Sequence, residues 1–269
     1  MTIEDFIHNL KKENKKSLRE IIDEVNKVKI DEGGYGSVYK FEYDGKIYAL
    51  KEISLAKLAP KELNEYEKEA KILSKFNNEY IVKYYDSFTK DNKFYIIMEY
   101  GGDKTLKKFI DDKNSNDELI EPETINSIIK QICLGLKEIH DAGITHRDLK
   151  PANIFIDENL RIKIGDFGSS TSSNYFTTII GTLQYAAPEL LDDKKLGDKF
   201  SNKVDIYSLG CIFYELFTLS NYYGDKIYNS IKEINTNFYD NKWQKLINLM
   251  LSLNPDERPN IGDIFNYLD

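Results

Sequence analysis

Three side chains near the middle of the chain have the types and the spacing to bind a metal ion and to accept a proton: Asp148, Asn153 and Asp166. Residues 154–164 between them contain two apolar stretches separated by a turn-like Asp-Glu-Asn sequence, which predicts a β-hairpin. Because a hairpin brings its ends together, Asp148 and Asn153 should lie beside Asp166. One carboxylate would then accept a proton, while an amide and a carboxylate hold Mg²⁺, a cation that prefers oxygen ligands. This chemistry is that of phosphoryl transfer.

The elements that must position these residues follow from the periodicity of the apolar side chains. The first third of the chain is rich in strand patterns, with an Asp44-Gly45 turn signal, and the rest is rich in helix patterns. The helix predicted at 123–141 has one apolar face, and the helix predicted at 203–219 is apolar nearly all round, so both should belong to the core. The predicted fold class is therefore α+β. The pattern predicts strands at 28–30, 37–43, 46–53, 81–88 and 94–99, and helices at 61–76, 123–141, 203–219, 243–252 and near Ile261.

A glycine-rich stretch lies between the first two predicted strands, at Gly33, Gly34, Tyr35 and Gly36. Glycines allow the backbone to approach a ligand closely enough for its N–H groups to meet phosphate oxygens. A strand that contains Val38 follows, where a dinucleotide-binding fold would require a helix, so that fold is excluded. A glycine-rich hairpin turn that binds no ligand is the alternative.

A lysine on the next strand would face the same ligand. The two-residue period of a strand places Ala49 and Lys51 on one face, so a small side chain and a positive charge would lie beneath the glycine stretch. Glu69 lies on the otherwise inward face of the helix predicted at 61–76 and is the natural partner of Lys51, because leaving either charge half-buried and unpaired costs roughly 3 to 5 kcal/mol. The alternative for Lys51 is a solvated surface lysine.

The consecutive residues His146–Asn153, together with Asp166-Phe167-Gly168, resemble the catalytic loop and the metal-binding motif of eukaryotic protein kinases. The likeness extends over residues 27–268 and includes the major motifs in order. It implies a bilobal protein-kinase-like fold and a serine/threonine kinase that uses ATP and Mg²⁺ to act on a Ser or Thr hydroxyl of a protein substrate. The implied domains are an N-terminal helical extension at 1–26, an N-lobe with an antiparallel sheet plus one helix at 27–99, and a mainly helical C-lobe at 100–269.

The resemblance gives each residue of the polar loop a role. Asp148 would accept or orient the proton of the substrate hydroxyl, and Lys150 would stabilise the transferring phosphoryl group. Asn153 and Asp166 would hold Mg²⁺, and His146 would be structural rather than a base. Each of these residues taken alone is more often a cap, a turn residue or a packed side chain. Their joint spacing favours the catalytic interpretation.

The same resemblance implies a nucleotide site. Lys51, paired with Glu69, would bind the α- and β-phosphates. Met98 would be the gatekeeper, and the family's first motif glycine is replaced by Asp31. Ordinary packing is the alternative for the residues that would surround adenine. The implied nucleotide-binding set is Gly33, Gly34, Tyr35, Gly36, Val38, Ala49, Lys51, Glu69, Met98, the main chain of Glu99 and Gly101, and Phe155, which would close one side of the adenine ring.

A polar stretch rich in Ser and Thr, residues 169–178, resembles an activation loop. A phosphate on Thr178, or as the next candidate on Thr177, would add about −1.5 to −2 charge and could pair with Arg147. An unmodified, flexible Ser/Thr loop is the alternative. The resemblance also implies three structural residues in the C-lobe: Asp205 as a brace of the catalytic-loop backbone, and Glu189 with Arg258 as a buried ion pair.

The composition limits the partners that we expect. The 269 residues include 37 Lys plus Arg against 45 Asp plus Glu, a formal net charge of −8, which gives no basic footprint for nucleic acid or anionic lipid. No apolar run reaches the roughly 18 residues that a membrane span needs. Cys133 and Cys211 fall in apolar helical patterns, so we expect buried hydrophobes in a reducing compartment. A cytoplasmic protein is the expectation.

The sequence leaves some alternatives open. Residues 1–26 carry apolar side chains at helical spacing, which predicts one or two amphipathic helices that either pack on the N-lobe or bind a partner or a second copy. The intact motifs favour an active enzyme, and the alternative is a pseudokinase-like scaffold that binds nucleotide without transferring phosphate. The subfamily is open as well. Residues 98–106 and 162–168 resemble kinases of translation initiation factor 2α, whereas residues 207–216 resemble NimA-related kinases.

Overall fold

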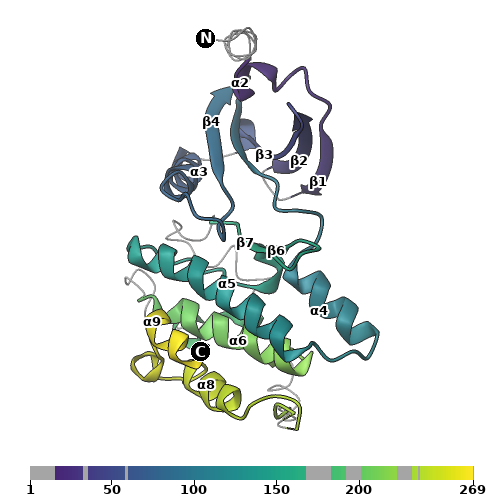
Figure 1. Cartoon of the computed structure of the whole chain (residues 1–269). Helices are drawn as coiled ribbons and strands as arrows, with labels where there is room; N and C mark the ends of the chain where they lie inside the picture. Colours follow the sequence, from purple (N-terminus) through teal and green to yellow (C-terminus); the bar gives the residue numbers. More distant parts are fainter. Residues whose placement is uncertain are drawn as a thin grey trace, which may run out of the picture. The chain divides into compact units, whose positions relative to one another are not determined.

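The computed structural model of the chain divides into two units, one made of Met1–Leu63 with Tyr84–Tyr100, and the other of Asn64–Lys83 with Gly101–Asp269. Helix α3 (Pro60–Leu73) begins in the first unit and continues into the second. Figure 1 shows the strands of the first unit and the helices of the second unit. The domain boundaries expected at 26/27 and 99/100 stay predictions. The structure describes residues 16–32, 36–57, 60–167, 183–191, 201–222, 232–235 and 237–268, without the side chains of 57, 60–62 and 65.

Five antiparallel strands form the sheet of the first unit in the order β1-β2-β3-β5-β4. Asp44 and Gly45 join β2 to β3 with φ angles of 53° and 69°, as a two-residue hairpin turn requires. Asp91 and Asn92 join β4 to β5 in the same way, with φ angles of 48° and 58°. The predicted antiparallel sheet is confirmed. The strands are β1 (Val28–Glu32), β2 (Gly36–Tyr43), β3 (Lys46–Ser54), β4 (Tyr84–Lys90) and β5 (Lys93–Glu99).

The strand predicted at 81–88 is wrong at its start, because β4 begins at Tyr84. The main chain just before β4 bonds instead to β7 (Ile162–Ile164). Ile164 N donates to Tyr80 O at 2.8 Å, and Val82 N donates to Ile164 O at 2.9 Å. Apolar periodicity reports burial and not the identity of the partner strand, so it could not separate these residues from β4.

Residues 18–25 pack against one face of the sheet of the first unit. Helix α2 (Leu18–Ile21) begins with a capping box, in which Ser17 Oγ accepts from Glu20 N and the Glu20 carboxylate accepts from Ser17 N. The helix lies beside β4 (Figure 1), where Arg19 forms an ion pair with Asp86 at 3.0 Å. These residues thus take the packing role that was one of the two expectations, and residues 1–15 lie outside the described part. The cluster contains Ile21, Ile22, Phe41, Tyr48, Leu50, Phe88, Tyr95 and Ile97.

Replacing Ile22 with Ala is expected to lower the free energy of unfolding by about 2 to 5 kcal/mol, because the side chain is fully buried in this cluster and its removal leaves a cavity. Urea unfolding followed by circular dichroism measures the change. Val28→Ala is the matched control, because Val28 is 50% exposed in the same unit and should change stability by less than about 0.5 kcal/mol. Equal losses in both variants would show that residues 18–25 do not belong to the folded core.

The second unit is mainly helical, as predicted. The six isoleucines and leucines expected on one face of α5, at positions 125, 128, 129, 132, 136 and 139, are all fully buried. Helix α6 is buried at every residue from Val204 to Phe217, which confirms a helix that runs through a core. Figure 1 shows α6 between α5 and α8, and α6 contacts both. The elements are α4 (Leu106–Ser115), α5 (Pro122–Asp141), α6 (Lys203–Thr218), α8 (Lys242–Met250) and α9 (Ile261–Ile264), with strands β6 (Ile154–Ile156) and β7.

Helix α4 was not predicted from the sequence. Its N-cap is Thr105, whose side chain accepts from Lys108 N, and it buries Leu106, Phe109 and Ile110. This cap and the spacing of three and four residues were the available signal. The helix contains only three apolar residues and five charged ones, so its amphipathic pattern is too short to predict a helix.

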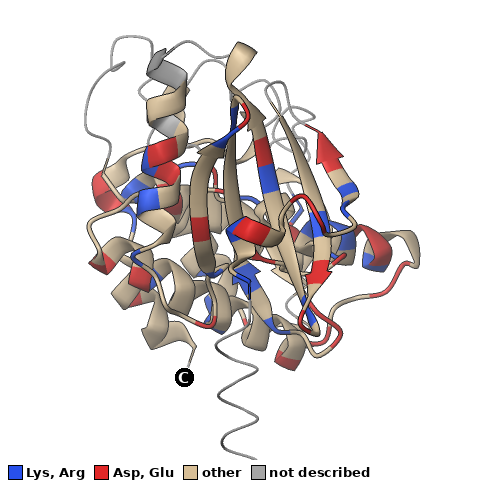
Figure 2. Ribbon diagram, turned by 90° about the horizontal axis from the view of Figure 1, so that it is seen from above, with Lys and Arg blue, Asp and Glu red and all other residues tan. Residues whose placement is uncertain are grey.

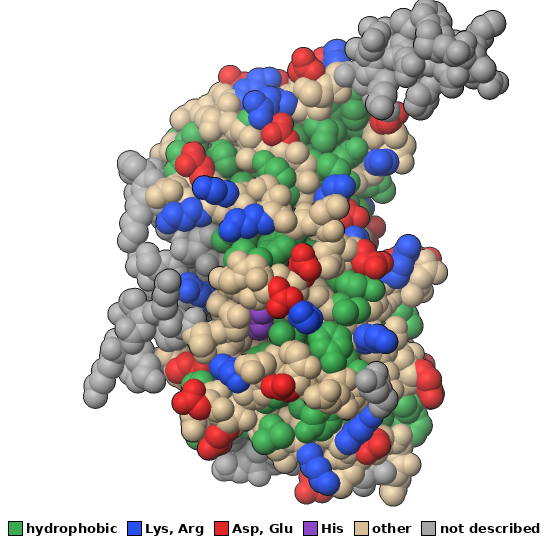
Figure 3. All heavy atoms as spheres, turned by 60° about the vertical axis from the view of Figure 1, so that its left-hand side comes forward, with side chains coloured by type: hydrophobic (Ala, Val, Ile, Leu, Met, Phe, Trp, Pro, Cys, Tyr) green, Lys and Arg blue, Asp and Glu red, His purple; other side chains and the backbone are tan. Residues whose placement is uncertain are grey.

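Positive and negative side chains are mixed along the strands and helices (Figure 2), and Figure 3 shows the same mixture on one face of the molecule. Exposed ion pairs such as Lys29–Glu32 at 2.8 Å and Lys108–Asp112 at 2.8 Å connect neighbouring turns or strand positions. Such pairs contribute little to stability individually. Within the described residues, none of the helices combines the length and the hydropathy that a bilayer crossing requires.

Candidate active site

The predicted hairpin is present in the second unit and joins two of the predicted ligands. Strands β6 and β7 pair antiparallel, with Ile154 opposite Ile164. At the open end of the hairpin, Gly165 N donates to Asn153 O at 2.9 Å. Asp166 is the next residue after Gly165, so the two strands place Asn153 and Asp166 at the same end of the ribbon.

Two predicted catalytic residues and one predicted metal ligand are in direct contact just before β6. Lys150 Nζ lies 2.8 Å from Asp148 Oδ2, and Asn153 Nδ2 donates to the same oxygen at 3.0 Å. Asn153 Nδ2 also donates to the main-chain oxygen of Asp148 at 2.9 Å. Asp148 is only 5% exposed and Asn153 8%. A nearly buried carboxylate is thus held between an ammonium group and an amide, which fixes its orientation.

The same contacts decide which atom of Asn153 is available to a cation. Because Nδ2 is directed at Asp148, the amide presents Oδ1 as its oxygen ligand. Asp166 adds a carboxylate that is exposed to solvent. An amide oxygen and a carboxylate are the small donor set with which proteins hold Mg²⁺ that is also bound to phosphates, so the residues present fit this ion.

Two residues next to the site have an unusual backbone conformation. Arg147 and Asp166 have φ angles of 69° and 57°, in the left-handed region that residues with a Cβ rarely adopt. Such a conformation costs about 1 to 3 kcal/mol and persists only where the surroundings enforce it. Backbone outliers of this kind cluster at functional sites, which agrees with the placement of both residues.

Asp205, in the first turn of α6, holds the main chain before Asp148. Its Oδ1 accepts from Arg147 N at 2.7 Å, and its Oδ2 accepts from His146 N at 2.8 Å. His140 Nε2, from the end of α5, lies 2.8 Å from Oδ2. Asp205 is fully buried, and burial raises the pKa of its carboxyl, but the hydrogen bonds, first of all that from His140, outweigh burial and leave the pKa below its ordinary value. The carboxylate therefore stays charged and fixes the loop.

The lowered pKa predicts how acid affects the protein. A carboxyl with a lowered folded-state pKa contributes stability above its unfolded pKa of about 3.9, and this contribution is lost as the pH falls toward the folded value. Asp205→Asn should therefore be less stable than the wild type at pH 6, and the gap should narrow below about pH 4. Urea unfolding at pH 6 and at pH 3.5 measures the difference in the free energy of unfolding between the two proteins. A difference that is larger at pH 3.5 than at pH 6 would contradict the prediction.

His146 is a packed residue, as the sequence implied. Its Nδ1 accepts from Asp148 N at 3.3 Å, and its Nε2 lies 3.1 Å from Gly165 O. The His146 ring also contacts Phe167, with a centroid distance of 4.9 Å, and Phe167 contacts Phe76 at 5.6 Å. Both ring nitrogens of His146 are thus engaged by backbone, which connects the loop before β6 to the chain after β7.

Phe155 and Gly101, both expected at the adenine ring, lie against each other in the second unit. A Cβ added to Gly101 would be 2.4 Å from Phe155 Cγ, so only glycine fits at this position. The Phe155 ring also lies against Gly165, where an added Cβ would be 2.9 Å from Phe155 Cε2. The aromatic side chain therefore contacts both the segment after β5 and the end of β7.

Replacing Gly101 with Ala is expected to lower the free energy of unfolding by about 1 to 3 kcal/mol, because the new methyl group must displace the Phe155 ring. Thermal unfolding measures the loss. Gly262→Ala is the matched control: a Cβ there meets no heavy atom within 4 Å, and the residue lies in helix α9, where Ala is preferred to Gly. If both variants were as stable as the wild type, the close packing of Gly101 on Phe155 would be wrong.

In the first unit, four predicted nucleotide-binding residues lie on one face of the sheet. Val38 is opposite Lys51, and Ala49 is opposite Met98, so the strand period places all four side chains together. Glu99 is opposite Tyr48 and faces the other side. The sheet thus carries a lysine, a small residue and two apolar residues on one surface, the composition expected at a nucleotide.

The remaining predicted residues are divided between the units or lie outside the described part. Gly36 begins β2, where an added Cβ would be 2.0 Å from Glu52 O, so sheet packing alone requires a glycine there. Glu69 lies in the second unit and is 2% exposed. Its pairing with Lys51 stays a prediction. Gly33, Gly34, Tyr35, Gly168, Thr177 and Thr178 lie outside the described residues.

Glu189 and Arg258 form the ion pair that the resemblance implied. Arg258 Nη1 and Nη2 donate to Glu189 Oε1 and Oε2 at 2.6 and 2.8 Å, a two-pronged pair in which the guanidinium is 1% exposed. Arg258 also donates to Ser252 O at 2.8 Å and to Lys203 O at 2.9 Å. The pair therefore connects the segment that contains Glu189 to the start of α6 and to the loop after α8.

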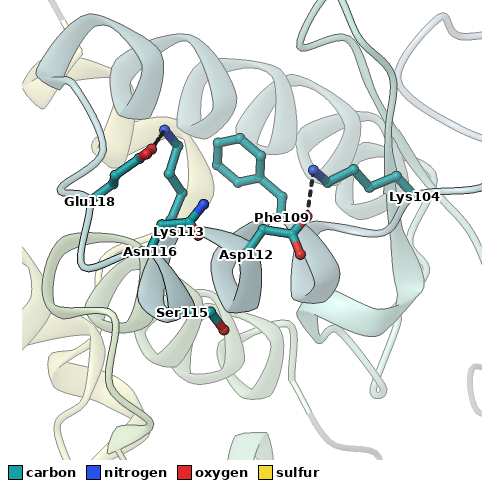
Figure 4. Close-up of a pocket in the computed structure, with 7 residues that line it drawn as sticks. All are labelled: Lys104, Phe109, Asp112, Lys113, Ser115, Asn116 and Glu118. Atoms are coloured by element: carbon teal, nitrogen blue, oxygen red, sulfur yellow. Dashed lines mark hydrogen bonds and ion pairs between the residues drawn. The ribbon is translucent and has the colours of Figure 1, made fainter.

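A separate pocket of about 370 Å³ lies along α4, and no predicted site residue lines it. Figure 4 shows its charged side chains in pairs, with Lys104 bonded to Asp112 and Lys113 bonded to Glu118. Lys104 also lies over the Phe109 ring, 5.5 Å from its centroid. Since each charge in the pocket meets an opposite one, the pocket presents no net charge to a ligand.

Comparison with known proteins identifies relatives over most of the chain. A model of the protein kinase domain family matches residues 25–267. Serine/threonine-protein kinase Nek1 of Mus musculus is 34% identical over 252 residues, which are 88% of this chain and 20% of that protein. The probable serine/threonine-protein kinases nek3 and nek2 of Dictyostelium discoideum are 34% and 35% identical, over 90% and 88% of this chain. The chain covers 23% and 60% of their lengths, so it spans between a fifth and three fifths of these three relatives.

Proposed function

Because this chain belongs to the protein kinase family, we propose that it is an ATP-dependent serine/threonine protein kinase. It would transfer the γ-phosphoryl group of ATP to a Ser or Thr hydroxyl of a protein substrate. The observation that carries the proposal is the contact of Asp148 with both Lys150 and Asn153. A scaffold that only binds nucleotide has no need of this arrangement. The similarity to the Nek proteins agrees with the likeness of residues 207–216 to NimA-related kinases.

The residues of the second unit would act as follows. Asp148 accepts or orients the proton of the substrate hydroxyl, for which its fixed carboxylate is suited. Lys150, 2.8 Å from that carboxylate, stabilises negative charge on the transferring group. Asn153 Oδ1 and the Asp166 carboxylate would hold Mg²⁺, which would supply positive charge to neutralise the phosphates of the nucleotide.

The residues of the first unit would bind the nucleotide. Lys51, in its predicted pair with Glu69, would contact the α- and β-phosphates, and the glycine stretch from Gly33 to Gly36 would cover them. Val38, Ala49 and Met98 share a face with Lys51 and would line the adenine site. The main chain of Glu99 and Gly101 would hydrogen-bond adenine, and Phe155 would close the ring from the other side.

Regulation by phosphorylation is part of the proposal. A phosphate on Thr178 or Thr177 would meet the guanidinium of Arg147, which precedes Asp148 and whose main-chain N–H is held by Asp205. Arg147 is therefore fixed at its backbone next to the carboxylate that does the chemistry. The cytoplasmic location, the protein substrate, and the binding of a partner or a second copy through the N-terminal helices of residues 1–26 stay predictions.

A transfer assay tests the proposal. The full chain is incubated with radiolabelled ATP, Mg²⁺ and a generic protein substrate, and the labelled product is analysed for phosphoserine, phosphothreonine and phosphotyrosine. We expect label on Ser or Thr, and a loss of at least about a hundredfold in Asp166→Ala. Nucleotide binding without transfer in the wild type would favour the scaffold. Equal transfer by the wild type and Asp166→Ala would reject the residue assignment.

A further inference from the structure

The outer edge of β7 needs hydrogen-bond partners other than β6. In an antiparallel pair, alternate residues turn their N–H and C=O groups away from the partner strand. On β7 these residues are Ile162 and Ile164. Ile164 lies at the end of β7 nearest Asp166. Its N–H donates to Tyr80 O at 2.8 Å, and its main-chain oxygen accepts from Val82 N at 2.9 Å. Ile162, next to the turn, bonds to a side chain.

That side chain is Gln131 of α5. Its Oε1 accepts from Ile162 N at 3.1 Å, and its Nε2 donates to Leu160 O at 2.8 Å. One primary amide thus satisfies a main-chain donor and a main-chain acceptor on either side of Arg161. The Gln131 amide also donates to Ser127 O, one turn earlier in α5, at 3.2 Å, which holds the side chain against its own helix.

One helical turn further along α5, Gly135 lets the helix approach the same strand. A Cβ added to Gly135 would be 3.0 Å from Ile164 Cδ1 and 3.0 Å from Tyr80 O. Residues four apart on a helix share a face, so Gln131 and Gly135 meet β7 from one side. The amide of Gln131 is a polar contact of α5 with the hairpin, and the missing Cβ at Gly135 lets the two elements pack closely.

We propose that Gln131 is a positioning residue, which fixes β7 along α5 and thereby sets the place of Asp166 relative to Asn153. The inference rests on the proposed function, since it concerns the Mg²⁺ site. Without Gln131, the outer edge of β7 would be held by main-chain bonds only at Ile164, and the turn end of the hairpin, where β7 is paired with β6 alone, could move relative to α5. The two bonds from Gln131 oppose this motion. Removing a group that hydrogen-bonds directly to a metal ligand changes metal affinity by about 10- to 100-fold, and because Gln131 acts through the main chain of β7 we expect a change at the lower end of this range.

Two variants of the full chain test the role. Gln131→Met keeps the length of the side chain and removes both hydrogen bonds. Gln131→Glu keeps the acceptor for Ile162 N and turns the donor into a carboxylate oxygen that faces Leu160 O. Binding of Mn²⁺ is measured by electron paramagnetic resonance with a non-hydrolysable ATP analogue present. Amide hydrogen exchange at Ile162 and Gly165 gives a second readout without metal or nucleotide.

The matched control is Gln244→Met. Gln244, in α8, is also a helical glutamine whose Oε1 accepts from a main-chain N–H, that of Ile234 at 3.0 Å, but neither residue belongs to the hairpin. Both Met variants should lose similar stability. Only Gln131→Met should raise the half-saturating Mn²⁺ concentration, by about tenfold, and accelerate exchange at Ile162 and Gly165. Gln131→Glu should weaken Mn²⁺ binding less and keep slow exchange at Ile162.

The outcomes separate this inference from the proposed function. Mn²⁺ binding by Gln131→Met as tight as by the wild type would overturn the positioning role, as would an equal loss in Gln244→Met. If Gln131→Met does not fold, Gln131→Glu decides by the same two readouts. A wild type that binds no Mn²⁺ with the nucleotide analogue would overturn the proposed function, and this inference with it.

Discussion

Replacing Asp148 with Asn is expected to lower the rate of phosphoryl transfer by a factor of about 10² to 10⁴, the contribution that a positioned general base makes. The variant keeps the shape of the side chain and can still accept from Lys150 and Asn153, so the fold should survive. It loses the charge that accepts or orients the substrate proton. Steady-state kinetics with a generic protein substrate measure kcat and KM separately, and the loss should fall on kcat.

The control for this variant is Asp117→Asn. Asp117 is exposed and has a φ angle of 54°, a conformation that Asn adopts as readily as Asp, so its rate and stability should match those of the wild type. An Asp148→Asn protein that is fully folded and as active as the wild type would refute the assignment of Asp148. A loss of rate that comes only with unfolding would refute the stated cause.

Replacing Arg258 with Met should lower the free energy of unfolding by about 3 to 5 kcal/mol, because it leaves the Glu189 carboxylate, whose side chain is only 9% exposed, without its cation. It also removes the donors to Ser252 O and Lys203 O, two main-chain acceptors on different segments. Guanidinium chloride unfolding measures the loss. The double variant Arg258→Met with Glu189→Leu should recover part of it, because the unpaired charge is gone.

Arg161→Met is the matched control for stability. Arg161 also pairs with a carboxylate, Asp157 at 2.7 Å, but its side chain is 74% exposed, so solvent screens the pair and its loss should cost about 1 kcal/mol or less. If Arg258→Met destabilised the protein no more than Arg161→Met does, the pair of Arg258 with Glu189 would have no special role in holding its three segments together.

The features that sequence could predict are those that local physics decides. The hairpin follows from two short apolar stretches and a turn. The long helix α5 follows from the spacing of its buried isoleucines. In each case the signal is contained in a few consecutive residues, and the observed structure agrees with the prediction.

The features that sequence could not predict depend on which distant segments meet. In the sequence, Gln131 is one of several polar residues beside the apolar face of a helix. Its role depends on its hydrogen bonds to the hairpin, which the sequence pattern does not indicate. His140 was not singled out for the same reason, since its partner Asp205 is on another helix. The predicted start of β4 was wrong because the main chain of Tyr80 and Val82 hydrogen-bonds to β7. For the segment before β4, the sequence pattern correctly indicated apolar residues that are buried, but it could not indicate the strand to which they bond.

The anchoring of Phe167 and Glu189 has a consequence for how a phosphate could act. Phe167 is packed on His146, and Glu189 is held by Arg258, so the chain between them is tethered at both ends to the second unit. A phosphate carried by this tethered chain would meet Arg147 at an effective concentration that is set by the chain itself and not by the concentration of the protein. A single phosphorylated threonine there would therefore bind in an intramolecular, concentration-independent step, and dilution of the protein would not release it.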